Sequence, residues 1–361
     1  MEKQATHPVN SGDRPGRPAG LKAGHAGPAD RRIHSPTDAR TIGKVLSHYD
    51  IPAIGKVAPL PGGTANRNFL VETARGRYFF RARHFKYSYP EHARLDHALK
   101  RHLARRKMPV AEPMATTTGE TLVVLDGGYY ELYPYLAGEP FHWEREDELS
   151  SAACALARCH KALADFPQPN APPRRKDSPE DILAGLEEVR RLTRDARVLR
   201  EIDYLAEQAG AIAANLPDKK YFSLPCHMIH GDYHPANVIF RGGNVSGIFD
   251  WDCAAWLPKM RDVADGLIFF AARREGRFDA TNIVTLLKCC WADERRFDVF
   301  LREYVNENSL SGAGLKSLGW FVRARWIFSR VEGRLKVPKK TWPAYLVSGI
   351  RPLLEWCDKN F

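Results

Sequence analysis

Strand-like and helix-like hydrophobic patterns occupy different parts of this 361-residue chain. From Ile54 onward, short apolar runs are broken by glycines, and turn residues stand at 74–76 and again at 126–128. Runs of this length that are separated by such turns predict an antiparallel sheet. Between the two pairs, residues 91–108 carry apolar side chains at helical spacing and end before a proline. We therefore expect residues 41–135 to form a small antiparallel β-sheet with one helix.

After residue 138 the hydrophobic periodicity becomes mostly helical. Residues 149–163 place their apolar side chains along one helix face, where His160 is expected to be a hydrogen-bonded core residue. Further segments that fit helices are 182–192, 202–216, 261–273, 281–291 and 319–331. We expect residues 136–361 to form a larger, mostly helical unit. The sequence thus predicts an α+β fold with two lobes.

The N-terminal residues 1–40 have a different composition from the rest of the chain. They are rich in Pro, Gly, Ala and charged residues, and they contain almost no large apolar side chains. Burial of such a segment cannot offset the entropy lost on ordering it, so we expect a flexible tail.

The stretch HGDYHPANVIFRGGNVSGIFDWD, residues 230–252, gathers polar side chains around few apolar ones. Its VIF and GIF runs flank a glycine-bearing turn, which predicts a hairpin that brings Asn237 beside Asp250. Asp232 lies in the loop that precedes this hairpin. Phosphoryl transfer requires magnesium held by hard oxygen ligands and a carboxylate that accepts the proton of the attacking hydroxyl. Asp232, Asn237 and Asp250 are chemically suited to these tasks.

The net charge of +11 is unevenly distributed along the chain. Between Arg75 and Lys107 there are eleven Lys or Arg residues and two acidic residues, so we expect one strongly positive face. Such a face could serve nucleic acid or the phosphates of a small ligand, or it could be only a solvated surface. Nucleic acid is disfavoured, because no aromatic RNA-binding pattern, zinc finger or basic heptad array accompanies the charge.

The sequence also favours a cytoplasmic protein without a membrane segment. Its longest apolar run, residues 266–272, is far shorter than the roughly 20 residues that a bilayer span needs. The first thirty residues lack the apolar region of a secretory signal. The seven cysteines are odd in number and contain no CxxC pair, which argues against both a disulfide framework and a zinc cage.

HGDYHPANVIF followed by IFDWD resembles the signature of the aminoglycoside phosphotransferase and choline kinase superfamily, small-molecule kinases with a protein-kinase-like fold. The resemblance extends from about Ile54 to the C-terminus and includes PGGTANRN, YFFRAR, LDHAL and ELYPYLAGE. RYFFRARH and LYPYLAGEP look most like the homoserine kinase type II and spore-coat-kinase-like branches. The resemblance implies transfer of a phosphoryl group from ATP, bound with magnesium between the lobes, to a hydroxyl of a small molecule.

The resemblance also implies roles for individual residues. Asp232 would be the catalytic base, and Asn237 and Asp250 would be the magnesium ligands. The residues that would lie over the nucleotide phosphates are Gly62, Gly63 and Thr64.

A second set of nucleotide-binding residues departs from the kinase pattern. Protein kinases pair a strand lysine with a helix glutamate, and the matching positions here are Arg81 and Asp96. Arginine can hold phosphate oxygens through its planar fork, although its geometry differs from that of an ammonium group. A slip of one or two residues would give these places to Arg83 or Glu91 instead.

The basic charge of the chain disfavours a polycationic aminoglycoside as the acceptor, so homoserine or another amino alcohol is the first choice. Two alternatives stay open. The substitutions at Arg81 and Asp96 are compatible with a relative that binds nucleotide without turnover. The spacing of His230, Asp232 and His234 also resembles a fragment of a metal-dependent hydrolase site. The sequence makes no prediction of the oligomeric state.

Overall fold

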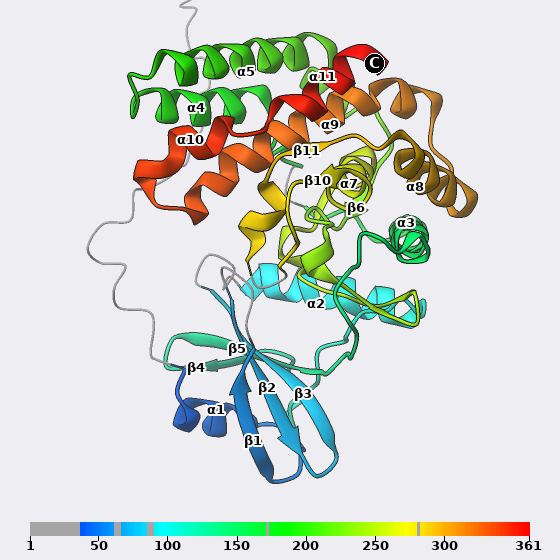
Figure 1. Cartoon of the computed structure of the whole chain (residues 1–361). Helices are drawn as coiled ribbons and strands as arrows, with labels where there is room; N and C mark the ends of the chain where they lie inside the picture. The colour runs from blue at the N-terminus through cyan, green and yellow to red at the C-terminus, as the bar shows by residue number, and fades with distance from the viewer. Residues whose placement is uncertain (1–36, 61–65, 85–89, 171–172, 280–281) are drawn as a thin grey trace, which may run out of the picture.

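The computed structural model describes residues 37–60, 66–84, 90–170, 173–279 and 282–361. They form two lobes, a small one built around a sheet and a larger helical one (Figure 1). The predicted α+β architecture is confirmed. The boundaries at residues 40 and 135 stay predictions, although the first described helix begins at Ala39, just ahead of the first boundary.

The small lobe contains an antiparallel sheet whose five described strands follow the order β1-β2-β3-β5-β4. Their bounds are β1 Ile54–Pro59, β2 Arg67–Thr73, β3 Gly76–Ala82, β4 Val123–Leu125 and β5 Gly128–Pro134. Both predicted turns are present, at 74–75 between β2 and β3 and at 126–127 between β4 and β5. Phe80 and Leu132 are paired across β3 and β5 and are fully buried, so they form part of the lobe's core.

The small lobe also has a helix that the sequence pattern did not predict. Helix α1, Ala39–Leu46, begins at Asp38, whose side chain accepts a hydrogen bond from the Thr41 amide. It buries Ile42, Val45 and Leu46 against the sheet. Because it is only 8 residues long and follows a polar, glycine-rich segment, its apolar stripe is too short to stand out.

Helix α2, Pro90–Arg105, confirms the predicted helix and connects the two lobes. Leu99 and Leu103 are buried in the core of the large lobe. Asp96 and Lys100, in contrast, join a polar cluster beneath the small-lobe sheet. One helix therefore packs on one lobe and makes polar contacts to the other, in the position between them that Figure 1 shows.

The large lobe is mostly helical. Its described α-helices are α3 Glu146–Leu163, α4 Pro179–Arg190, α5 Ala196–Asn215, α6 Asp218–Tyr221, α7 Met260–Gly266, α8 Glu294–Glu307, α9 Gly312–Gly333, α10 Trp342–Val347 and α11 Arg351–Asn360. Helices α3, α4, α5, α7 and α9 cover predicted segments, whereas α8, α10 and α11 were not predicted. In the described part of the chain, no helix combines the length and the apolar character that a bilayer span requires.

The helix predicted at 281–291 is wrong. Its described part contains a 3-10 turn, Ile283–Leu287, and the short strand β11, Cys290–Trp291. Strand β11 pairs with β10, Arg273–Arg274, which follows a π-helical continuation of α7 over Leu267–Ala271. The local pattern was compatible with a helix, but pairing with a distant strand decided the conformation.

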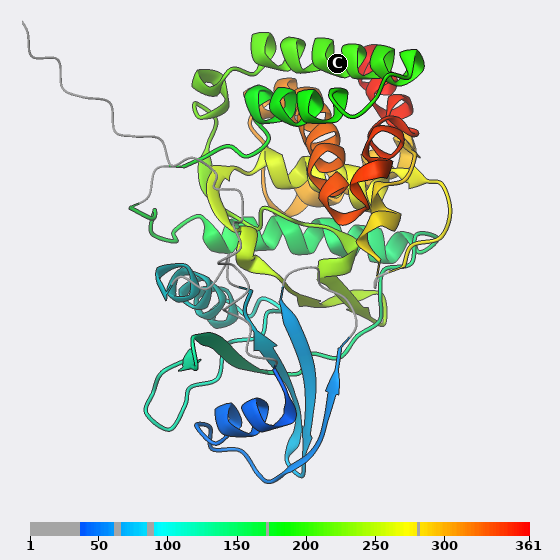
Figure 2. The same ribbon diagram turned by 90° about the vertical axis from the view of Figure 1, so that its left-hand side faces the viewer.

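The predicted hairpin is present at the interface of the lobes, drawn yellow-green in Figure 2. Strand β7, Val238–Arg241, pairs with β8, Asn244–Ile248. A second pair flanks it, formed by β6, Cys226–Ile229, and β9, Ala255–Pro258. The loops that leave β6 and β8 therefore emerge close together, and they carry the polar residues of the HGDYHPAN and DWD motifs.

Candidate active site

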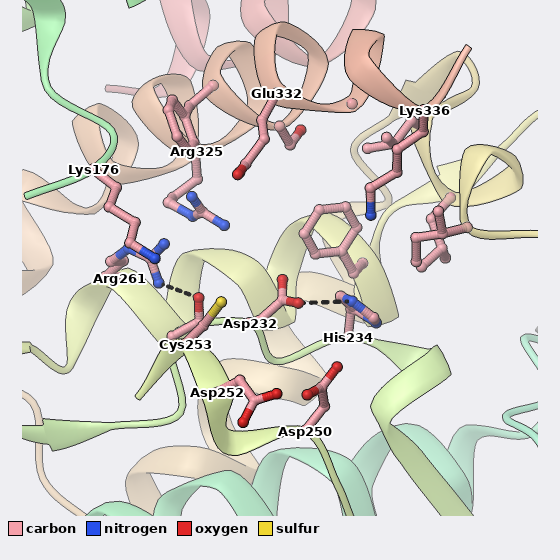
Figure 3. A pocket seen from close by; sticks show the side chains of 18 of the residues that line it. Lys176, Asp232, His234, Asp250, Asp252, Cys253, Arg261, Arg325, Glu332 and Lys336 are labelled. Carbon is pink, nitrogen blue, oxygen red and sulfur yellow. Dashed lines mark hydrogen bonds and ion pairs between the residues drawn. The ribbon is translucent and has the colours of Figure 1, made fainter. Parts of the chain in front are cut away.

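A pocket of about 220 Å³ is lined by residues of both lobes. Asp232, Asp250 and Asp252 approach it from the loops around the hairpin, and Arg81 approaches it from β3. The opposite wall is helix α9, which contributes Arg325 (Figure 3). The pocket thus has carboxylates on one side and a cationic helix face on the other.

The loop that carries Asp232 is fixed by a buried aspartate of α7. The amide N–H groups of His230 and Gly231 donate to Asp262 Oδ2 at 2.7 Å and to Oδ1 at 2.9 Å. His160 Nε2 lies 3.2 Å from Asp262 Oδ2, so the predicted role of His160 as a hydrogen-bonded core residue is confirmed. Although burial acts to raise it, the pKa of Asp262 is held below its usual value by His160, His230 and Arg261. The carboxylate therefore stays ionised while it accepts the loop's amides.

Glycine is required at position 231 in this loop. Its φ is +77°, and a Cβ there would lie 2.2 Å from the carbonyl oxygen of Cys253. The adjacent His230 has Nε2 at 2.8 Å from the Phe249 carbonyl oxygen, so Nε2 carries the proton. Nδ1 of His230 then accepts the Asp232 amide at 3.2 Å. The two residues before Asp232 thus fix the backbone from which its side chain projects.

The Asp232 carboxylate is oriented by His234, whose Nε2 lies 3.3 Å from Oδ2. The side chain of Asp232 is 38% exposed, and it lines the pocket. Burial acts to raise the pKa of Asp232, but His234, His230 and Arg325 bring it well below its usual value. The group is ionised at neutral pH and can accept a proton from a bound hydroxyl.

Asn237 and Asp250 lie close to this loop at the open end of the hairpin, one just before β7 and the other just after β8. The side-chain amide nitrogen of Asn237 donates to the Asp232 carbonyl oxygen at 2.9 Å, which leaves its amide oxygen as the ligand atom. The Phe249 amide donates to the Asn237 carbonyl oxygen at 2.9 Å and so ties the two ends together. The hairpin prediction that Asn237 and Asp250 come together is therefore supported by the backbone pairing.

Three features of Asp250 are compatible with a cation ligand. Its backbone is left-handed, with φ 58° and ψ 62°, a strained conformation for aspartate. The pKa of Asp250 is raised to about 6 by burial and by the nearby carboxylates of Asp252 and Asp232, although the charge of Arg81 acts to lower it. Among the described residues, its buried Oδ1 has no hydrogen-bond partner. A divalent cation would satisfy that oxygen and favour the ionised form, so these residues fit magnesium.

The structure separates the two residues predicted to form the nucleotide-binding ion pair. Arg81 lies in the pocket, 3.9 Å from Asp250 and 3.5 Å from Asp252. Asp96 instead pairs with Arg83 at 3.0 Å and with Lys100 at 2.9 Å. The direct ion pairs of Asp96 are thus with Arg83 and Lys100, and Arg81 faces the carboxylates of the hairpin loop. Arg83, the alternative left open by the sequence, is the residue that contacts Asp96.

Arg81 presents unused donors to the site. Its Nε and Nη1 are buried and have no hydrogen-bond partner among the described residues. Although burial acts to lower it, the pKa of Arg81 is raised by the carboxylates of Asp252 and Asp250. A permanently charged guanidinium with unpaired N–H groups suits phosphate oxygens.

Arg83 forms the centre of a buried cluster that joins the lobes. Its guanidinium contacts Asp96 and Glu131, and its Nη2 donates to Asp252 Oδ1 at 2.8 Å. Asn66, at the start of the described residues before β2, donates to the other Asp252 oxygen at 2.7 Å. Asp252 therefore links the hairpin loop to the small lobe, in addition to lining the pocket.

This cluster contains only part of the basic segment of residues 75–107. Arg81, Arg83 and Lys100 are buried and paired with acidic groups, so their charges are not available to an external polyanion. The expected positive face stays a prediction, because other basic residues of the segment are exposed: Arg75, Arg77, Arg94, Arg105, Arg106 and Lys107. The predicted phosphate loop, Gly62, Gly63 and Thr64, lies outside the described residues.

The sequence did not identify the residues of α9 and of other segments that line the far wall. Arg325, Glu332, Lys336 and Lys176 all line the pocket and are labelled in Figure 3. Part of the signal was available, because Arg325 lies within the helix predicted at 319–331, and Glu332 and Lys336 continue its helical spacing beyond the predicted end. What the sequence could not show is that this face turns toward Asp232.

Residues 56–300 match the family described as the phosphotransferase enzyme family. The chain belongs to this family. It is 29% identical over 330 residues to the homoserine kinase of Afipia carboxidovorans, a match that covers 89% of this chain and 91% of the relative. It is also 27% identical over 317 residues to the homoserine kinase of Rhodopseudomonas palustris strain TIE-1, covering 85% of this chain and 88% of the relative.

Solved structures of phosphotransferases share the fold. The amicoumacin kinase hAmiN, solved with AMP-PNP, Ca²⁺ and Ami, superposes with a TM-score of 0.62 at 17% identity, covering 89% of this chain and 94% of that chain. Choline kinase from Cryptosporidium parvum Iowa II gives a TM-score of 0.53 at 16% identity, covering 89% of this chain and all of the other. The predicted protein-kinase-like fold is thereby confirmed.

As a member of the phosphotransferase enzyme family, the protein is a small-molecule kinase that uses ATP and a hydroxyl acceptor. The family assignment argues against the alternative of a metal-dependent hydrolase. The geometry agrees, because both ring nitrogens of His230 are already engaged by backbone groups.

Proposed function

We propose that this phosphotransferase moves the γ-phosphoryl group of ATP, in the presence of Mg²⁺, to the hydroxyl of an amino alcohol such as homoserine. One observation carries the proposal: the carboxylates of Asp232 and Asp250 open into the same pocket. The names of the two homoserine kinases to which the chain is similar support homoserine as the acceptor.

Each residue has a distinct task in this proposal. Asp232 accepts the proton of the attacking hydroxyl, and His234 keeps its carboxylate oriented. The oxygens of Asn237 and Asp250 would hold a magnesium ion, which would supply positive charge to the phosphate oxygens. Arg81 binds a phosphate oxygen through its unpaired N–H groups.

The loop geometry contributes by fixing where the proton acceptor lies. Asp262 holds the amides before Asp232, and His230 holds the Asp232 amide itself. A carboxylate fixed in this way loses little freedom when the acceptor binds, which lowers the entropic part of the barrier.

The experiment that tests the proposal is an acceptor panel with Mg²⁺ and ATP. ADP release and the phosphorylated product are measured for homoserine, choline, ethanolamine, hydroxylysine and an aminoglycoside. We expect a phosphate ester of homoserine to form at the highest kcat/KM. Absence of product from every acceptor, with ATP still bound, would favour the non-catalytic alternative.

A further inference from the structure

Helix α9 and the 3-10 turn that follows it, Arg334–Lys336, present a polar stripe to the active-site pocket. Arg325, Ser329, Glu332 and Lys336 are spaced by four, three and four residues, which places them along one helical face. All four line the pocket, and Figure 3 shows the side chains of Arg325, Glu332 and Lys336 directed toward the space above Asp232. This stripe is therefore directed at the place where an acceptor must present its hydroxyl.

The charges on this stripe are only partly neutralised by the protein. Glu332 and Lys336 are four residues apart, yet in the described ranges neither forms an ion pair with the other or with any other side chain. Arg325 is 4% exposed and uses Nε and Nη2 to bind Asp265 at 2.8 and 3.2 Å. Its Nη1 is buried without a hydrogen-bond partner among the described residues.

Other arginines of the same helical region, Arg323, Arg330 and Arg334, also have a buried Nε without a hydrogen-bond partner among the described residues, but none of them lines the pocket. Arg325 differs from them because it lies in the pocket wall. A buried guanidinium N–H without an acceptor is costly, so an anionic ligand group that reaches it gains binding energy.

We infer that the acceptor is a zwitterionic hydroxy-amino acid, whose ammonium group binds Glu332 and whose carboxylate binds Arg325 Nη1 and Lys336. This inference deepens the proposed function, since it rests on Asp232 facing the acceptor hydroxyl. Arg325 and Glu332 are seven residues apart, or about 10 Å along the helix axis, so their long side chains converge from two sides on a small ligand between them. A simple amino alcohol would satisfy Glu332 but provide no acceptor for Arg325 Nη1 and no counter-charge for Lys336.

Two truncated acceptors separate these contributions. 3-Aminopropan-1-ol is homoserine without its carboxylate, and 4-hydroxybutyrate is homoserine without its ammonium group. For the unchanged protein, we expect both to have a kcat/KM at least about tenfold below that of homoserine, because each leaves a charged group of the pocket without its partner on the ligand.

The decisive variants are Glu332→Gln and Lys336→Met, which remove one charge each. Glu332→Gln should raise the KM for homoserine and 3-aminopropan-1-ol by about three- to tenfold, because the residue is exposed, and leave that for 4-hydroxybutyrate unchanged. Lys336→Met should raise the KM for homoserine and 4-hydroxybutyrate, by about three- to tenfold because the residue is exposed, and spare 3-aminopropan-1-ol. Matched controls are Glu207→Gln on α5 and Lys316→Met on α9, both exposed and outside the pocket lining.

The inference is supported if each pocket variant impairs only the acceptors that carry the group which the replaced residue binds. If either pocket variant changes all three acceptors alike, or changes none of them, the inference is overturned. Calorimetric binding of homoserine to the ADP-loaded protein gives a readout that does not need turnover. If the unchanged protein phosphorylates none of the acceptors, the proposed function fails, while the effect of Glu332→Gln on homoserine binding still decides the inference.

Discussion

Replacement of Asp262 by Asn should uncouple the catalytic loop from the helical lobe without touching any reacting group. Asp262 accepts the amides of His230 and Gly231 at 2.7 and 2.9 Å, and His160 Nε2 lies 3.2 Å away. An asparagine oxygen can keep one amide, but its NH₂ group would face the other N–H. The change therefore removes one charge-assisted hydrogen bond and adds a donor–donor contact, at a cost of about 2 kcal/mol.

We expect the loop to move so as to relieve this unfavourable contact, and this movement would displace Asp232. A misplacement of about 1 Å at a reacting group can lower the rate about 100-fold, so we expect kcat to fall by that order while the KM for ATP stays within about threefold. Steady-state kinetics with saturating homoserine measures both parameters. The control is Asp298→Asn, which removes an exposed carboxylate on α8 outside the pocket lining. A variant at 262 whose kcat stays within twofold of the unchanged protein would refute the argument that these two hydrogen bonds position the base.

Three further substitutions test the assigned roles. Asp232→Asn should lower kcat by about 10³-fold while ATP binding, measured by calorimetry, stays nearly unchanged; full activity would remove its assignment as the base. Asp250→Ala should weaken both Mg²⁺ activation and nucleotide binding, seen as a higher half-saturating Mg²⁺ concentration, and an unaltered Mg²⁺ titration would exclude it as a ligand. Arg83→Met leaves the carboxylates of Glu131 and Asp252 without their shared cation and should lower the free energy of unfolding by about 3–5 kcal/mol, measured by urea denaturation. Unchanged stability of that variant would show that Arg81 and Lys100 alone can neutralise the cluster.

Local patterns were sufficient for the parts of the fold whose signal is contained in a short window. The turns at 74–76 and 126–128 and the hairpin of residues 238–248 have strand-forming runs on both sides of glycine-bearing turns. Helix α1 had too short a stripe to be recognised, and the segment 281–291 took its conformation from pairing with β10. In both cases the stabilising contacts come from residues distant in sequence.

The residues of the site also fall into two groups, those that the local sequence predicts and those that only the tertiary structure brings to the pocket. The sequence alone determined which residue types are available for phosphoryl transfer, because Asp232, Asn237 and Asp250 stand close together along the chain and a hairpin is enough to gather them. Only the tertiary structure decided that Asp96 pairs with Arg83 rather than Arg81, since a buried carboxylate binds whichever cations the packing of helix and sheet brings within reach. Only the tertiary structure, likewise, turned the charged face of α9 toward Asp232. Periodicity shows that side chains share a helix face, but the direction of that face depends on how the whole helix packs against the rest of the protein.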